Sequence, residues 1–187
     1  MKIIKTKIKD LLVFESVNFY DNRGYFREVL LEKIIKKRFK FTVISSSKKN
    51  VLRGLHMQKK FPQGKYISVI KGKILDVVVD CRKKSKTFGK YFSIVLSEKN
   101  NKSLLIPTGF AHGFYTLTDN VIIHYKCSKY RHVKSEMGIL WKDKELKINP
   151  FLRCNNMSIR NKINKEFNVS GDDFETFTAL REWKDNY

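Results

Sequence analysis

Short runs of β-branched and aromatic residues, separated by turn residues at regular intervals, occupy the middle of the chain. Residues 66–70 and 74–80 flank Lys71-Gly72-Lys73, which predicts a β-hairpin with a glycine in its turn. Further strand-like runs follow at 91–96, 103–107 and 121–125. This even spacing is typical of β-sandwiches and barrels, so we expect one all-β domain over residues 1–187.

Two helices are expected as small additions to the strands. The first, over residues 30–38, places leucines and isoleucines on one helical face. The second, over residues 173–185, spaces Phe174, Phe177 and Leu180 along one face, and Asp172 precedes it as a capping residue. The pattern therefore predicts a short early helix and a C-terminal helix.

Composition narrows the class of protein. Hydrophobic residues make up 42% of the 187, enough for a packed core and too many for a mainly disordered chain. No run approaches the ~18 apolar residues that cross a bilayer, and the N-terminus lacks the apolar segment of a signal peptide. Cys81, Cys127 and Cys154 are widely spaced, which indicates neither a disulfide framework nor a zinc site. We expect a reduced, cytoplasmic protein that binds no membrane.

The formal net charge of +21 allows two interpretations. A strongly basic chain is compatible with binding to nucleic acid or to a membrane surface. The basic runs, such as residues 36–38 and 48–49, are short and scattered, and no recognition helix, zinc finger or RNP pattern accompanies them. We therefore expect a lysine-rich surface with no nucleic-acid partner, whose positive field attracts a diphosphate-bearing substrate.

His56 is the histidine with the most chemistry around it. Arg53 and Gln58 lie within three residues, and Lys65 follows shortly after. A titratable base beside cations suits proton abstraction next to a bound anion, although a histidine in a strand is more often structural. The chain has no His-x-His pair, so metal chemistry is not indicated, and it lacks the nucleophile-elbow, P-loop and dinucleotide motifs.

A set of motifs, each weak alone, occurs in the order found in one enzyme family. These are residues 21–28, 52–58, 76–82, 87–89, 106–114, 125–126 and 138–143. The most specific are Arg-Gly-Leu-His-x-Gln and Ile-Pro-x-Gly-Phe-Ala-His-Gly-Phe, which begin at Arg53 and Ile106. Over roughly residues 1–161 the chain resembles the dTDP-4-dehydrorhamnose 3,5-epimerase family.

The resemblance implies a cupin-type jelly-roll barrel that works without a metal or an organic cofactor. It also implies a homodimer that exchanges an N-terminal strand, and a nucleotide-linked 4-keto-6-deoxy sugar as substrate. The reaction removes a proton beside the C4 ketone and returns it on the opposite face, inverting C3, C5 or both. The chemistry is consistent with this, because a ketone acidifies both neighbouring carbons if the enolate oxygen is stabilised.

The same resemblance implies a role for each matching residue. His56 corresponds to the base, Tyr125 to the acid on the other face of the sugar, and Lys65 to the lysine that stabilises the enolate. Arg23 and Arg53 correspond to arginines that grip the diphosphate, for which a planar guanidinium is well shaped. The remaining residues that correspond to the substrate-binding pocket are Phe26, Glu28, Gln58, His112, Tyr130 and Arg131.

Three departures from the family pattern bear on specificity. Asn161 stands where the family has an aspartate that orients the catalytic histidine, and an amide cannot stabilise an imidazolium as a carboxylate does. Phe41 and Val43 replace the polar residues of a Gln-x-Asn-x-Ser pattern, and Tyr130-Arg131 replaces a pair of tyrosines.

These departures leave alternatives open. One is an epimerase of C3 alone or C5 alone, or one that takes a CDP- or GDP-linked sugar. Another is a non-catalytic barrel that binds sugar or nucleic acid. The joint presence of His56, Lys65 and Tyr125 favours an enzyme, because binding alone needs no acid–base set.

Overall fold

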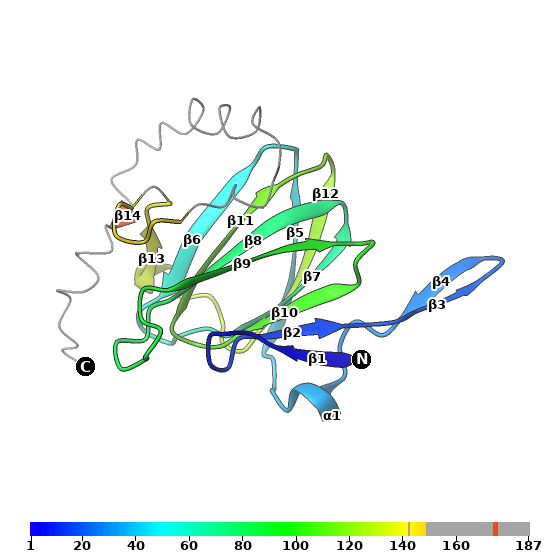
Figure 1. The fold of residues 1–187 in the computed structure, drawn as a ribbon, viewed down its shortest axis with the longest axis horizontal. Coiled ribbons are helices and arrows are strands. Elements are labelled where there is room, and N and C mark those ends of the chain that lie inside the picture. Colours follow the sequence, from blue (N-terminus) through cyan, green and yellow to red (C-terminus); the bar gives the residue numbers. More distant parts are fainter. Residues whose placement is uncertain (142, 149–173, 176–187) are drawn as a thin grey trace.

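The computed structural model describes residues 1–141, 143–148 and 174–175, and almost all of its regular structure is β-strand. Two six-stranded sheets pack face to face, and a separate two-stranded hairpin extends from them (Figure 1). Every strand pairing in the two sheets is antiparallel except one, as in a jelly roll. The prediction of an all-β jelly-roll fold is confirmed.

The first sheet has the chain's N-terminal strand at one of its edges. Its strands, in spatial order, are β1 (Lys2–Lys5), β2 (Leu12–Glu15), β10 (Lys102–Ile106), β7 (Lys65–Lys71), β12 (Val121–Cys127) and β5 (Phe41–Ser47). β1 and β5 are therefore the two edges of this sheet.

The second sheet lies against the first. Its strands, in spatial order, are β14 (Phe174–Glu175), β13 (Glu136–Ile139), β6 (Leu52–Gln58), β11 (Phe110–Thr116), β8 (Lys73–Asp80) and β9 (Tyr91–Ser97). A short 3₁₀ turn, Val133–Ser135, leads into β13.

The core lies between the sheets and continues behind the second one. Ile67, Leu104 and Ile123 from the first sheet meet Val78 and Phe114 from the second in one buried cluster. The residues of β8 that point the other way enter a second cluster, so this strand is buried on both faces. Burial on both faces explains why β8 reads as a nearly continuous apolar run instead of an alternating one.

One buried carboxylate holds the loop after β8 in place through hydrogen bonds. Asp80 is fully buried and accepts hydrogen bonds from Arg82, Ser85 and Thr87 at 2.6–2.8 Å. Burial raises the pKa of Asp80, but these hydrogen bonds outweigh it and lower the value to about 2. Asp80 and Arg82 thus form a structural ion pair within the Asp-Cys-Arg motif.

The two predicted helices have different outcomes. Within residues 30–38 only α1 (Glu32–Ile35) forms, because Lys36 adopts a left-handed conformation with φ of 52° and ends the helix. The C-terminal prediction is wrong for Phe174–Glu175, which form β14 by pairing in parallel with the edge of β13. The other residues of that predicted helix lie outside the described residues.

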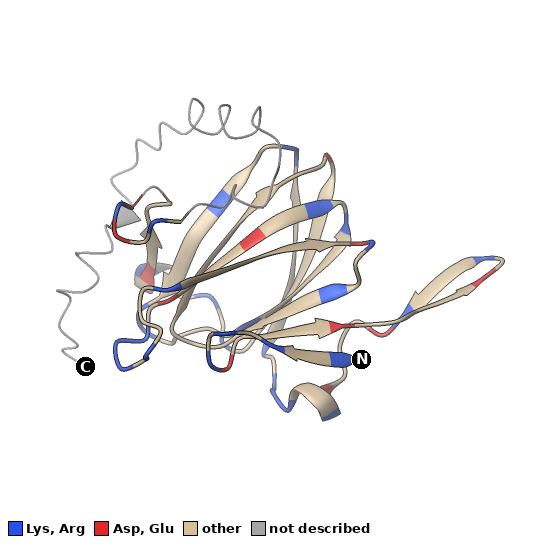
Figure 2. Cartoon of the chain, in the orientation of Figure 1, with Lys and Arg blue, Asp and Glu red and all other residues tan. Residues whose placement is uncertain are grey.

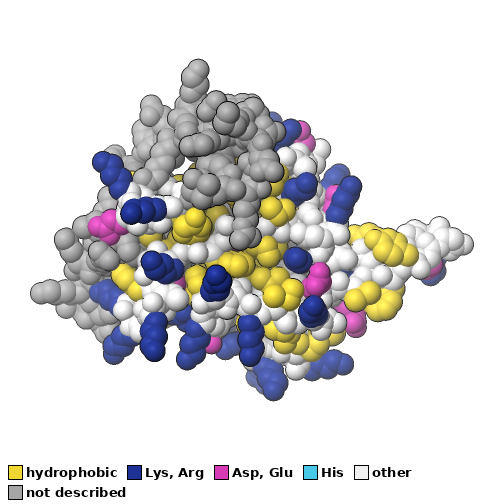
Figure 3. Space-filling model, in the orientation of Figure 1, with side chains coloured by type: hydrophobic (Ala, Val, Ile, Leu, Met, Phe, Trp, Pro, Cys, Tyr) yellow, Lys and Arg dark blue, Asp and Glu magenta, His cyan; other side chains and the backbone are white. Residues whose placement is uncertain are grey.

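A hairpin of β3 (Asn18–Asp21) and β4 (Gly24–Arg27) extends away from both sheets (Figure 1). Its aromatic side chains are exposed and form hydrophobic areas along the hairpin (Figure 3). These residues are Phe19, Tyr20, Tyr25 and Phe26. Most large apolar side chains of a folded domain are at least partly buried, so this exposed group is a distinct feature of the hairpin.

The basic side chains are spread over many elements. Lys and Arg occupy strand ends and loops on both sheets (Figure 2), and the face in Figure 3 shows them interspersed with neutral and apolar side chains. None of the described helices is long and apolar enough to cross a membrane. This distribution accords with a generally lysine-rich surface.

Candidate active site

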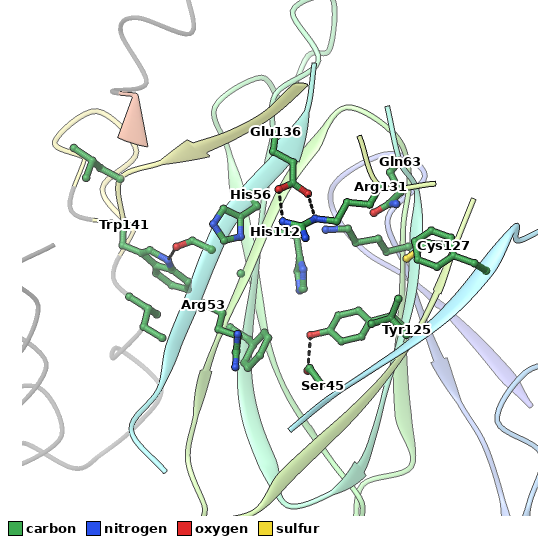
Figure 4. Close-up of a pocket in the computed structure, with 18 residues that line it drawn as sticks. Ser45, Arg53, His56, Gln63, His112, Tyr125, Cys127, Arg131, Glu136 and Trp141 are labelled. Carbon is green, nitrogen blue, oxygen red and sulfur yellow. Dashed lines mark hydrogen bonds and ion pairs between the residues drawn. The ribbon is translucent and has the colours of Figure 1, made fainter. Parts of the chain in front are cut away.

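A pocket of about 720 Å³ opens between the two sheets, within the usual size range of small-molecule sites. Strands β5, β7 and β12 of the first sheet form one wall, and β6, β11 and β13 of the second form the other (Figure 4). The polar side chains that line it are Ser45, Arg53, His56, Gln63, Lys65, His112, Tyr125, Arg131 and Glu136. The predicted base, acid and lysine therefore share one cavity.

Two glycines, one on β6 and one on β11, allow these strands to approach closely next to His56. Gly54 has φ of +94°, and a Cβ there would lie 2.5 Å from the carbonyl oxygen of His112. A Cβ on Gly113 would lie 2.5 Å from the carbonyl oxygen of Arg53. The register of the two strands places His56 directly opposite His112. Close packing thus explains the glycines in both of the most specific motifs.

His112 is held by a carboxylate from the neighbouring strand. Its Nε2 lies 2.8 Å from Oδ2 of Asp76 on β8, and both side chains are buried. The second carboxylate oxygen of Asp76 is buried without a hydrogen-bond partner among the described residues. This pair orients the His112 ring at the base of the pocket.

Burial and a neighbouring charge both shift the pKa of His56. Burial lowers the pKa of His56, and the positive charge of Lys65 lowers it further. Burial also lowers the pKa of Lys65. The lowered pKa of His56 keeps its imidazole neutral near neutral pH, and neutral imidazole is the form that accepts a proton.

Tyr125 comes from the other sheet and faces the histidines (Figure 4). Its hydroxyl lies 3.4 Å from Oγ of Ser45 on β5. Burial raises the pKa of the Tyr125 phenol, so it remains protonated and available as a proton donor. A neutral base and a protonated acid thus lie on opposite walls of the pocket.

Two further cations border the cavity. Arg53 donates a hydrogen bond from Nε to Oγ of Ser47 at 3.0 Å. Arg131 contacts the two oxygens of Glu136 through Nε and Nη2, at 2.7 and 2.8 Å. Because anionic substrate groups are attracted to guanidinium groups, Arg53 is well placed to bind a phosphate.

Five predicted site residues lie outside this pocket, and a sixth is not described. Gln58 lines a small adjoining recess, where its side-chain amide donates to the carbonyl of Phe61 and accepts from the backbone of His132. Tyr130 is exposed and stacks on Phe41 with ring centroids 5.6 Å apart. The N-terminal predictions are Arg23 and Phe26 on the projecting hairpin and Glu28 directly after it. Asn161 lies outside the described residues.

Metal ligands are sparse in the described part of the chain. Residues 1–141, 143–148 and 174–175 contain no group of three or more histidine, cysteine or acidic side chains that could hold a metal ion.

Comparison with known proteins identifies the family. A family model described as dTDP-4-dehydrorhamnose 3,5-epimerase matches residues 5–170. The chain belongs to this family. The 3,5-epimerase of Methanothermobacter thermautotrophicus is 41% identical over 152 residues, which cover 79% of this chain and 82% of that protein. The 3,5-epimerase of Salmonella typhimurium is 42% identical over 168 residues, covering 86% and 92%.

A solved 3,5-epimerase shares the fold. The dTDP-6-deoxy-D-glucose-3,5-epimerase of Legionella pneumophila, solved in complex with dTDP-4-keto-L-rhamnose, is 41% identical. The TM-score is 0.76, and the match covers 79% of this chain and 82% of that one. The chain is therefore a carbohydrate epimerase of the isomerase class, with a nucleotide-linked keto sugar as the kind of substrate.

Sequence reasoning missed several residues of the pocket. Glu136, Trp141, Gln63 and Cys127 line it but were not predicted as site residues. Trp141 packs against the second core cluster and also borders the cavity, where its Nε1 donates to the carbonyl of Gly54 at 2.7 Å. The Gly-Ile-Leu-Trp motif was the available signal, since an aromatic residue in a matching motif can line a site as well as a core.

Proposed function

We propose that this chain inverts both C3 and C5 of dTDP-linked 4-keto-6-deoxyglucose, yielding dTDP-4-keto-rhamnose. The observation that carries the proposal is the arrangement of His56 and Tyr125 on opposite walls of one pocket, with Lys65 beside them. An acid and a base on opposite faces of a sugar ring are what inversion requires.

The first step is proton removal beside the ketone. Neutral His56 takes the proton from the carbon next to C4, and the electron pair moves to the ketone oxygen. Lys65 stabilises the resulting enolate oxygen, because its ammonium group lies in the same low-dielectric pocket. The ketone activates C3 and C5 alike, so the same groups serve both positions if the ring is repositioned between the two inversions.

The second step is protonation from the other face. Tyr125 gives its phenolic proton to the same carbon as the enolate returns to the ketone, so the configuration inverts. His56 then loses its proton and Tyr125 regains one through exchange with solvent, which restores both groups. The raised pKa of Tyr125 supports this role, because the phenol is protonated before the step.

The substrate itself is tested by comparing nucleotides. Phe41 and Val43 line the pocket, as expected from the departures in sequence, and they give its first-sheet wall an apolar section. We expect kcat/KM for the dTDP-linked 4-keto sugar to exceed that for the CDP- and GDP-linked sugars by tenfold or more. A preference for CDP or GDP, or inversion at one carbon only, would favour the alternatives instead.

We further propose that the chain acts as a homodimer in which the β3–β4 hairpin reaches a second copy. The exposed aromatics of the hairpin support this, as does β5, an edge strand of seven residues without a charge. Uncharged edge strands pair readily with another chain. An exchanged hairpin also gives Arg23 and Phe26 a role near the partner's pocket, although both lie away from their own.

The dimer predicts a specific mass and a specific mutational effect. Light scattering should give a two-chain mass for the wild type. Phe26→Asp should shift the mass towards one chain and raise KM about tenfold, because a charge enters the buried contact and the added binding residues are lost. Val133→Asp, at an equally exposed apolar residue, serves as the control and should keep two chains. A one-chain wild type with full activity would contradict the proposal.

A further inference from the structure

Glu136 lies diagonally across a strand pair from the proposed base. In the antiparallel pairing of β13 with β6, Glu136 is opposite Gln58 and Gly138 is opposite His56. Residues two apart on a strand share a face, so Glu136 and His56 point to the same side. Gly138 has no side chain over His56, which leaves that space open to its diagonal neighbour. Both side chains line the pocket (Figure 4).

Arg131 keeps Glu136 ionised and fixed. The hydrogen bonds from its guanidinium at 2.7 and 2.8 Å lower the pKa of Glu136, and the charges of His56 and Lys65 act in the same direction. The carboxylate is held at both oxygens, so it has a defined orientation beside the pocket.

Within residues 1–141 and 143–148, the other groups that act on His56 do not bring a free carboxylate to it. Lys65 on β7, His112 on β11 and Arg131 each lower the pKa of His56, whereas Glu136 raises it. Asp76 is paired with His112. Tyr125 and Cys127 on β12 are neutral near neutral pH, because burial raises the pKa of each. Among the described residues facing His56, Glu136 is thus the carboxylate directed at the base.

We propose that Glu136 is a positioning residue that stabilises the imidazolium formed when His56 accepts the substrate proton. The inference rests on the proposed function of His56 as the base. A cation formed beside Lys65 and Arg131 is unfavourable, and a fixed carboxylate on the diagonal offsets that repulsion. The competing interpretation is purely structural, with the Glu136–Arg131 pair only joining β13 to the loop before it.

The test separates these interpretations by titrating His56 in the free protein. Its imidazole signal is followed by NMR against pH and is assigned by its absence in His56→Gln. In Glu136→Gln the negative charge is lost and the shape is kept, so the pKa of His56 should fall by about half a unit to one unit. The acid limb of kcat/KM should move to lower pH by the same amount, and kcat should fall about tenfold.

Two further variants complete the test. Glu136→Asp retains the charge and should recover most of the pKa and rate. Arg131→Gln removes a positive charge and should raise the pKa of His56, opposite in sign to Glu136→Gln, whereas a structural role predicts no opposite shifts. An unchanged His56 titration in Glu136→Gln, or shifts of the same sign in both, would overturn the inference. Absence of turnover by the wild type would instead refute the proposed function, since the titration needs no substrate.

Discussion

Replacing His56 by alanine should lower the rate of proton exchange at the sugar carbons by about 10³-fold or more and leave the chain folded. The imidazole is the group placed to take the proton, and its lowered pKa keeps it neutral for that purpose. Its neighbours are placed for other tasks, because His112 is bound to Asp76 and Lys65 is assigned to stabilise the enolate oxygen. Exchange is measured by NMR as deuterium entry from D2O.

A matched histidine provides the control. His124 precedes Tyr125 on β12, so it points to the opposite face of the sheet, and it does not line the pocket. His124→Ala should keep exchange close to that of the wild type. Circular dichroism should show the same β content for both variants. Near-full exchange by His56→Ala would remove this residue from the mechanism.

Replacing Tyr125 by phenylalanine should separate exchange from inversion. The ring still fills its place, but the phenolic proton is lost, so we expect product formation to fall by about 10²-fold or more. Proton removal by His56 from the other wall does not need the hydroxyl. Deuterium should therefore still enter the substrate with its configuration retained.

Tyr91→Phe is the control for this prediction. Tyr91 lies on β9 and packs against the second core cluster, away from the pocket. Loss of its hydroxyl should leave both exchange and inversion unchanged. Unchanged product formation by Tyr125→Phe would show that the proton comes from another donor.

Local sequence patterns predicted the strands in the middle of the chain better than they predicted the structure near its C-terminus. Both strands predicted on either side of Gly72 form, as β7 and β8, because β-branched runs favour strands locally. The predicted hairpin is wrong, since β7 pairs with β10 and β12 in the first sheet and β8 pairs with β9 and β11 in the second. The outcome at Phe174–Glu175 depends instead on an open edge of β13, which is far away in sequence. A helical spacing of apolar residues cannot reveal such a partner.

In the site, too, residues within local motifs were predicted, whereas residues placed by contacts between distant strands were missed. His56, Lys65 and Tyr125 were found from motifs, and the structure brings all three to one pocket. The partner of His112 was not predicted, because Asp76 reaches it only through the pairing of β8 with β11. Glu136 was missed for a similar reason, since its place beside His56 follows from strand register and not from spacing.

The projecting hairpin could be recognised only in three dimensions. Residues 21–28 were singled out by a family motif and not by a strand pattern. In the structure these residues lie exposed on an element that leaves the two sheets, and Arg23 at its turn pairs only with nearby Asp21 among the described residues. The exposure of these aromatic side chains is therefore a property of the fold that no single motif revealed.

Inversion at both carbons is tested most directly by the fate of hydrogen at C3 and C5 of dTDP-4-keto-6-deoxyglucose. The wild-type protein is incubated with this sugar nucleotide in D2O, and the product is mapped by proton and carbon NMR. We expect deuterium at both carbons, with both configurations inverted and dTDP-4-keto-rhamnose as the product. Recovery of the sugar with protium at both carbons, under conditions where the folded protein binds it, would contradict the account.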